Sequence, residues 1–154
     1  MLKNAELHNS LEAISRQHIV LKAKFIEFVE HIESSFGEFN PPIKGLSVKR
    51  TLDTNHVDIG FVDKTFRLVF SMTTTEQLSH PLGVVRCYSI EEYPEKTLID
   101  TGGFTFMPNG QSNLENPSEE GQLYIHFVGD AINIGLHLVH ESWPKSTTVT
   151  KIKA

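Results

Sequence analysis

The residues with the clearest chemical potential are His137, His140 and Glu141, which lie close together near the end of the sequence. On a helix, His137 and Glu141 would share one face with His140 alongside, and His126 could complete a set of metal ligands. On a strand, His137 and His140 would point to opposite faces and no site would form. Their order also differs from the His-Glu-x-x-His pattern of zinc peptidases. We therefore expect exposed histidines, no metal and no cofactor.

A second group lies in the run from Leu98 to Gly103, which reads Leu-Ile-Asp-Thr-Gly-Gly. Two apolar residues before Asp-Thr-Gly resemble the presentation of the catalytic aspartate in retroviral-type aspartic proteases, in which two carboxylates share a proton and activate a water. That family has Ala or Ser where Gly103 stands, and it needs a distant apolar-apolar-Gly strand. Ile134-Gly135 is too near to supply that strand. We therefore interpret Asp100 to Gly103 as a turn at a strand bend and predict no catalytic residue.

Other catalytic motifs are absent from the sequence. It contains no Gly-x-Ser-x-Gly elbow, no phosphate-binding Gly-x-x-x-x-Gly-Lys and no dinucleotide fingerprint. A Ser, His and Asp triad needs only to meet in space, so sequence alone does not test it. Enzymatic activity thus has no positive support.

One set of residues does favour binding. If residues 123–138 form a hairpin, its outward face carries Tyr124, His126, Asn133 and His137, with Gln122 opposite His137. Mixed aromatic and polar surfaces are typical of recognition sites. An ordinary solvated sheet face would explain the same residues equally well.

The element that starts the chain is predicted to be one long helix over 4–36. No Gly or Pro occurs from Glu6 to Phe36, and Gly37 ends the segment. A stripe recurs at alternating steps of four and three, formed by Leu7, Leu11, Ile14, His18, Leu21, Phe25, Phe28 and Ile32. We expect this stripe to pack on a sheet. The competing interpretation is a coiled-coil contact with a second copy.

Residues 44–140 are predicted to form an antiparallel sheet. Val57, Ile59 and Phe61 alternate with polar residues, as do Phe66, Leu68 and Phe70, and a two-residue loop at Asp63-Lys64 would place Phe61 opposite Phe66. Turn chemistry at Asp53-Thr54-Asn55 precedes this hairpin. Further strands are expected at Gly83–Ile90 and Thr97–Met107, with a bulge at Gly102-Gly103 and a polar loop over 108–121.

The region before Pro144 has two interpretations. Leu123, Ile125 and Phe127 alternate, Gly129-Asp130 would form a two-residue turn, and the alternation continues to Leu138, which favours a hairpin. The alternative is a helix over 131–143 with Ile132, Leu136, Val139 and Trp143 on one face. We favour the hairpin.

Together these elements predict an α+β fold, with one N-terminal amphipathic helix on a curved antiparallel meander of six or seven strands. The 154 residues suit a single domain, 1–154, that ends in a polar tail over 145–154.

The composition of the chain bears on which classes of partner it can bind and on where it is located. A net charge of −5 and a pI near 5.9 argue against binding to nucleic-acid phosphates or anionic lipid. The N-terminus lacks a signal-peptide pattern, no apolar run is long enough to span a bilayer, and Cys87 is the single cysteine, so we expect a cytoplasmic protein.

The sequence therefore predicts a small acidic non-enzymatic protein that binds another macromolecule, and we favour a protein as that partner. Inhibitors, immunity proteins, chaperones and phage-encoded blockers share this description. The surface would be a sheet face, the acidic loop 108–121 or the N-terminal helix, and that helix or a sheet edge could also form a homodimer. The alternative is a small-ligand binder or enzyme with a pocket between sheet and helix, lined by Phe25, Phe28, Phe61, Phe70 and Phe106.

Overall fold

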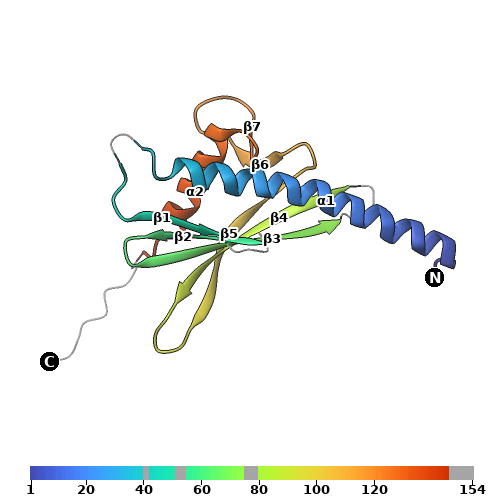
Figure 1. Ribbon diagram of the computed structural model, residues 1–154, viewed down its shortest axis with the longest axis horizontal. Coiled ribbons are helices and arrows are strands. Elements are labelled where there is room, and N and C mark those ends of the chain that lie inside the picture. The colour runs from blue at the N-terminus through green and yellow to red at the C-terminus, as the bar shows by residue number, and fades with distance from the viewer. Residues whose placement is uncertain (40–41, 51–54, 75–79, 146–154) are drawn as a thin grey trace.

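The computed structural model describes residues 1–39, 42–50, 55–74 and 80–145. Along these residues the chain forms a helix, seven strands and a second helix (Figure 1). The elements are α1 Asn4–Ser35, β1 Leu46–Arg50, β2 His56–Phe61, β3 Lys64–Thr74, β4 Pro81–Glu91, β5 Thr97–Phe106, β6 Gln111–Glu115, β7 Gln122–Tyr124 and α2 Val128–Ser142. Apart from Asn55 and Lys145, the expected turn at 53–55 and the expected tail at 145–154 lie outside the described residues.

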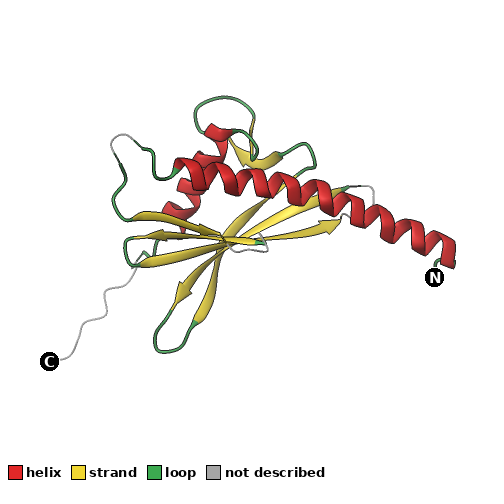
Figure 2. Cartoon of the chain, viewed as in Figure 1, coloured by secondary structure: helices red, strands yellow, loops and turns green. Residues whose placement is uncertain are grey.

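The strands form one open sheet in the order β1-β2-β3-β4-β5-β6-β7, each antiparallel to its neighbours. Both helices pack on one face of it, where α1 contacts β1, β3 and β4 and α2 contacts β4, β5 and β7 (Figure 2). The predicted α+β fold, with an N-terminal helix on an antiparallel meander, is thus confirmed. The layers are two: helices above, sheet below.

The core lies between these layers and is rich in phenylalanine. Phe25 of α1 stacks on Phe70 of β3 with ring centroids 5.3 Å apart, and Phe28 meets Phe104 of β5 edge-on at 5.9 Å. Phe106 lies 6.1 Å from Phe70 and is fully buried. The large aromatic side chains of α1 therefore fix the helix on the sheet.

The β2–β3 hairpin has the predicted buried face but not the predicted partners. Ile59 pairs with Phe66 and Phe61 with Lys64, so the two-residue turn is Val62-Asp63 rather than Asp63-Lys64. Side chains alternate with a period of two, so a shift of two residues leaves every apolar side chain on the same face. The alternation of apolar residues therefore determines which face of the hairpin is buried, whereas the position of the turn determines which residues pair across it.

The favoured hairpin at the end of the chain is wrong, and the alternative helix is correct. Residues 128–142 form α2, whose fully or largely buried positions are Ala131, Ile134, Gly135, Val139 and Ser142. These positions recur at helical spacing, and three of them are small. Gly135 lies so close to α1 that an added Cβ would come within 2.7 Å of Phe36 Cζ. Small residues therefore let the two helices approach.

The polar loop expected over 108–121 contains a strand. Gly110 has φ +90°, its N–H donates to the carbonyl of Met107, and the N–H of Met107 donates to the carbonyl of Gln111. This turn starts β6, whose Ser112 is buried and donates through Oγ to the carbonyl of Leu123 at 2.7 Å. The strand was missed because it is polar throughout except for Leu114.

Neither of the two helices in the described residues is both long and apolar enough to cross a membrane.

Candidate functional site

The first half of α1 carries an apolar stripe that nothing in the described structure covers. Leu7 is 45% exposed and Leu11 is 58% exposed, whereas Leu21 and Phe25 of the same stripe are 0% exposed. We call Leu7, Leu11 and the partly buried Ile14 the free stripe. It is continuous with the core-facing stripe of the same helix, because all these residues follow one four-and-three repeat.

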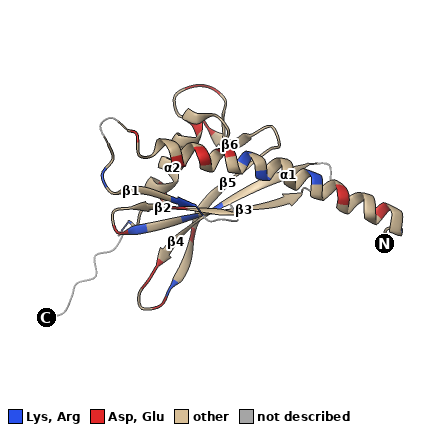
Figure 3. Ribbon diagram, viewed as in Figure 1, with Lys and Arg blue, Asp and Glu red and all other residues tan. Residues whose placement is uncertain are grey.

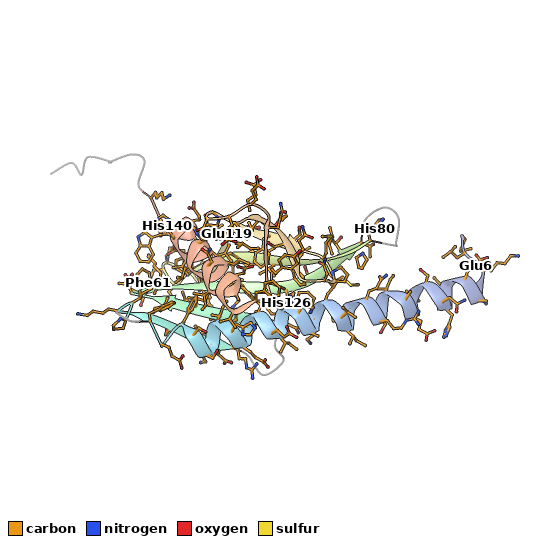
Figure 4. The ribbon with its side chains drawn as sticks, turned by 90° about the horizontal axis from the view of Figure 1, so that it is seen from above. Glu6, Phe61, His80, Glu119, His126 and His140 are labelled. Atoms are coloured by element: carbon orange, nitrogen blue, oxygen red, sulfur yellow. The ribbon has the colours of Figure 1, made fainter. Side chains whose placement is uncertain are left out.

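The stripe is uncovered because the helix is longer than the sheet beneath it. The ring of His18 lies 5.7 Å from that of Phe70, and from Leu21 onward the stripe is buried. Before this point α1 extends past the ends of β3 and β4 (Figure 1). Figure 4 shows Glu6 at the far end of this extension, well away from the body. The projecting residues 4–17 correspond to about 20 Å of helix.

The projecting half carries charges of both signs around the free stripe (Figure 3). Lys3, Glu6, Glu12 and Arg16 lie there, and His8 Nε2 is 3.8 Å from Glu12 Oε2 with both side chains largely exposed. Such exposed pairs contribute little to stability. The surface is thus an amphipathic helix whose apolar side faces solvent, and such a surface can bind an apolar complement.

A second apolar surface lies at the opposite end of the molecule. A cavity of about 430 Å³ opens beside the C-terminal end of α2, with Phe61, Leu136 and Val139 in its wall and His140 among its lining residues. Trp143 forms one side and meets Phe61 edge-on at 5.5 Å. Figure 4 shows Phe61 and His140 at the end of the molecule opposite to Glu6.

This cavity is not the pocket that the sequence suggested. Of its five predicted lining residues, Phe25, Phe28, Phe70 and Phe106 are buried core residues, and Phe61 alone lines the cavity. Seven of the ten phenylalanines are buried in the core and fill the space between sheet and helix instead of enclosing a pocket there.

The four predicted binding residues do not share a hairpin face, because that hairpin does not exist. Tyr124 ends β7, His126 lies in the connection to α2, and Asn133 and His137 are on α2. Tyr124 and His126 remain neighbours, with ring centroids 6.0 Å apart. The exposed Phe127, which sequence reasoning did not select, stacks on Tyr124 at 5.0 Å and lies 4.5 Å from His126. His137 instead lines a separate cavity of about 240 Å³ near Leu123.

His126 joins this aromatic group to α1. His31 Nε2 lies 2.9 Å from the carbonyl oxygen of His126 and therefore donates to it. The Nδ1 atom of His126 is buried and has no hydrogen-bond partner. Burial lowers the pKa of His126, and the charge of Lys24 lowers it further. Folding thus favours the neutral ring of His126 over its protonated form.

Asp100 and its neighbours form a β-bulge. Asp100 pairs with Arg86, with Nε to Oδ2 at 3.2 Å, and also accepts the N–H of Gly102 at 3.0 Å. Both side chains are exposed, and the hydrogen bond from Arg86 lowers the pKa of Asp100. A proton-sharing dyad needs the opposite shift in one carboxyl. The register shift between Cys87 and Tyr88 places the extra residue of this bulge at Thr101, one residue before the predicted Gly102-Gly103.

The bulge directs Thr101 towards α2. Thr101 Oγ1 donates to the carbonyl of Cys87 at 3.1 Å and lies 2.8 Å from Ser142 Oγ, which is 3.3 Å from the buried Cys87 Sγ. These three polar groups satisfy one another under the last turn of α2. They hold the helix end on the sheet.

His137, His140 and Glu141 lie on a helix, the geometry that would favour a metal. All three are exposed, and His140 Nδ1 is 3.5 Å from Glu141 Oε1. In the described part of the chain, no three His, Cys, Asp or Glu side chains are arranged to hold a metal ion. His126 belongs to the aromatic group beside Tyr124 and does not complete the set.

Sequence reasoning identified the whole stripe of α1 but not the point at which the sheet stops covering it. That point depends on where β3 and β4 end relative to His18, which the stripe itself does not encode. Comparison of the chain with protein-family models, with curated proteins and with solved structures finds no match, so the geometry described above is the basis for any functional proposal.

Proposed function

We propose that this protein acts without catalysis, by binding another protein through the free stripe of α1. The observation that supports the proposal is the half-covered stripe: Leu7 and Leu11 continue the pattern of Leu21 and Phe25 but remain about half exposed. Isolated exposed leucines are common on protein surfaces, whereas an amphipathic helix with its apolar side turned to water is a recurrent protein-docking element.

The charge distribution supports a protein partner over a nucleic acid. The chain carries 19 acidic and 14 basic residues, and Glu6 and Glu12 lie beside the free stripe. The net negative charge of the chain would repel a phosphate backbone. An apolar groove or helix with a polar rim would instead complement the free stripe and the charged residues beside it.

The test is capture of partners by matched variants. The immobilised wild-type chain is compared with a Leu7→Gln/Leu11→Gln double variant and with an Ile19→Gln control, and the retained proteins are identified by mass spectrometry. Ile19 is 65% exposed and lies about 100° around the helix from His18, so it is apolar but off the stripe.

We expect a partner to be retained by the wild type and by the control and to be lost from the double variant. The partner is then purified and its affinity for the three chains is measured by calorimetry. Equal affinity for all three would remove the free stripe from consideration and contradict the proposed function.

A further inference from the structure

We infer that the partner of the free stripe is a second copy of this chain, with the two α1 helices packed antiparallel. This rests on the proposed function, because it names the occupant of the same stripe. In this arrangement Leu7 of one copy lies opposite Leu11 of the other, and Asn4 lies opposite Ile14. Each stripe is then covered along its whole length, first by the second copy's helix and then by its own sheet.

The antiparallel direction follows from which side of α1 the sheet occupies. The free stripe and the buried residues Leu21 and Phe25 lie on one side of the helix, and the sheet fills that side from His18 onward. A parallel pair would bring two sheets to the same end, into the space between the two helices. An antiparallel pair places the bodies at opposite ends, where they do not compete.

The lengths agree with this register. The free part of α1 runs from Asn4 to about Gln17, and the sheet covers the stripe from His18. With Leu7 opposite Leu11, the start of the second copy's helix falls beside residues 14–17 of the first. The start of α1 in the second copy therefore meets the edge of the sheet in the first copy. Together they cover the whole apolar stripe of the first copy's α1 without a gap or an overlap.

Unsatisfied polar groups support the same placement. Gln17 Oε1 is buried without a hydrogen-bond partner, and the start of α1 at Lys3 has no side-chain cap for its first N–H groups. Helix N-termini leave such donors free. In the proposed register Gln17 of one copy lies opposite Met1 of the other, within about one helical turn of the uncapped start of α1, once on each side of the pair.

Charge also permits the antiparallel pair. A parallel pair would set Lys3 and the positive helix end of one copy beside those of the other. In the antiparallel register Lys3 lies opposite Ser15 and His8 lies opposite Ser10, so these basic groups do not face each other, although Glu6 lies opposite Glu12. The contact is short, and contacts that bury less than about 1,200 Å² in total are weak and transient. We therefore expect a concentration-dependent dimer.

The first measurement is the molar mass by light scattering over a range of protein concentrations. The mass should rise from the 17.4 kDa of one chain towards twice that value. The Leu7→Gln/Leu11→Gln variant should dissociate at least about a hundredfold more readily, whereas Ile19→Gln should change the dissociation constant by less than about threefold. A mass of one chain at every concentration would overturn the inference. The capture experiment would then still test whether the free stripe binds a different protein.

Direction is tested with single cysteines, because the native Cys87 is fully buried and does not interfere. Leu7→Cys and Leu11→Cys chains, one of them tagged, are oxidised with glutathione disulfide separately and as a mixture. An antiparallel pair gives a cross-linked dimer mainly in the mixture. A parallel pair cross-links each variant alone at least as well, and that result would overturn the proposed geometry. Circular dichroism checks that both variants are folded.

Discussion

The same side-chain deletion at two positions of one stripe should change stability by very different amounts. We compare Leu21→Ala, in the part of α1 that the sheet covers, with Leu11→Ala, in the projecting part; both are leucines of the same repeat. Leu21 is 0% exposed and lies in the core cluster, whereas Leu11 is 58% exposed. Because both variants replace leucine by alanine in the same helix, helix propensity changes equally in both. The difference between their free energies of unfolding therefore measures how much the sheet stabilises the leucine that it covers.

The expected magnitudes follow from burial. Replacing a fully buried leucine by alanine lowers the free energy of unfolding by about 2–5 kcal/mol, through lost transfer energy and the cavity left behind. For a chain of this size each kcal/mol lowers Tm by about 2–4 °C. Leu11→Ala should change the free energy of unfolding by no more than about 0.5 kcal/mol while the protein is a monomer, because little contact is lost and alanine favours the helix.

The assay is urea unfolding followed by far-ultraviolet circular dichroism, at a concentration where light scattering gives the mass of one chain. Repeating it at high concentration adds the dimer contact. Fully burying a leucine contributes about 1.5–3 kcal/mol, so the four half-exposed leucines of a pair would contribute about 3–6 kcal/mol to association. The wild type should therefore gain stability with concentration, and Leu11→Ala should gain less.

One result would refute this reasoning. If Leu11→Ala cost as much as Leu21→Ala in the dilute monomer, Leu11 would have to be covered within its own chain. The free stripe would then not exist in solution, and both the proposed function and the antiparallel pair would lose their basis.

Two further predictions concern the contacts that hold the second helix and its approach. Gly135→Ala should lower the free energy of unfolding by about 1–3 kcal/mol, because the new Cβ meets Phe36 and Ile32. The control Gly129→Ala, whose new Cβ has no atom within 4 Å, should be neutral or slightly stabilising. Equal effects of the two substitutions in thermal melts would contradict the close approach of the helices. The lowered pKa of His126 means that the unfolded chain takes up this proton first, so stability should fall as pH drops below about 6.5 and His126→Gln should flatten that slope in urea titrations; an unchanged slope would exclude His126 as its source.

The sequence predicted the elements whose apolar pattern is unambiguous. The four-and-three repeat from Leu7 to Ile32 and the alternation in β2 and β3 each match one type of element, and both were correct. In α2 the isoleucines and leucines fit both periods. The choice depended on Ala131, Gly135 and Ser142, which line the buried side but are not counted as core residues in a hydrophobic pattern.

The remaining differences have local physical causes. Asn109-Gly110 is a strong hairpin signal, but the polar residues after it concealed β6, which is held by backbone pairing and by Ser112 more than by apolar burial. The turn at Val62 could not be foreseen, because a valine with φ 58° is unusual and is tied there by its N–H bond to the carbonyl of Gly45. The extent of the sheet relative to α1 depends on strand ends, which are the least patterned part of a strand.

The length of α1 also governs how this protein moves through water. Its 32 residues form a rod of about 48 Å, of which about 20 Å projects beyond the sheet, and a compact body of 154 residues has a radius of gyration of about 15 Å. The projecting helix raises the friction of a single chain, so a monomer should elute from a sizing column ahead of a sphere of equal mass. Two such chains joined antiparallel would form a still longer particle, whose sedimentation would slow relative to its mass.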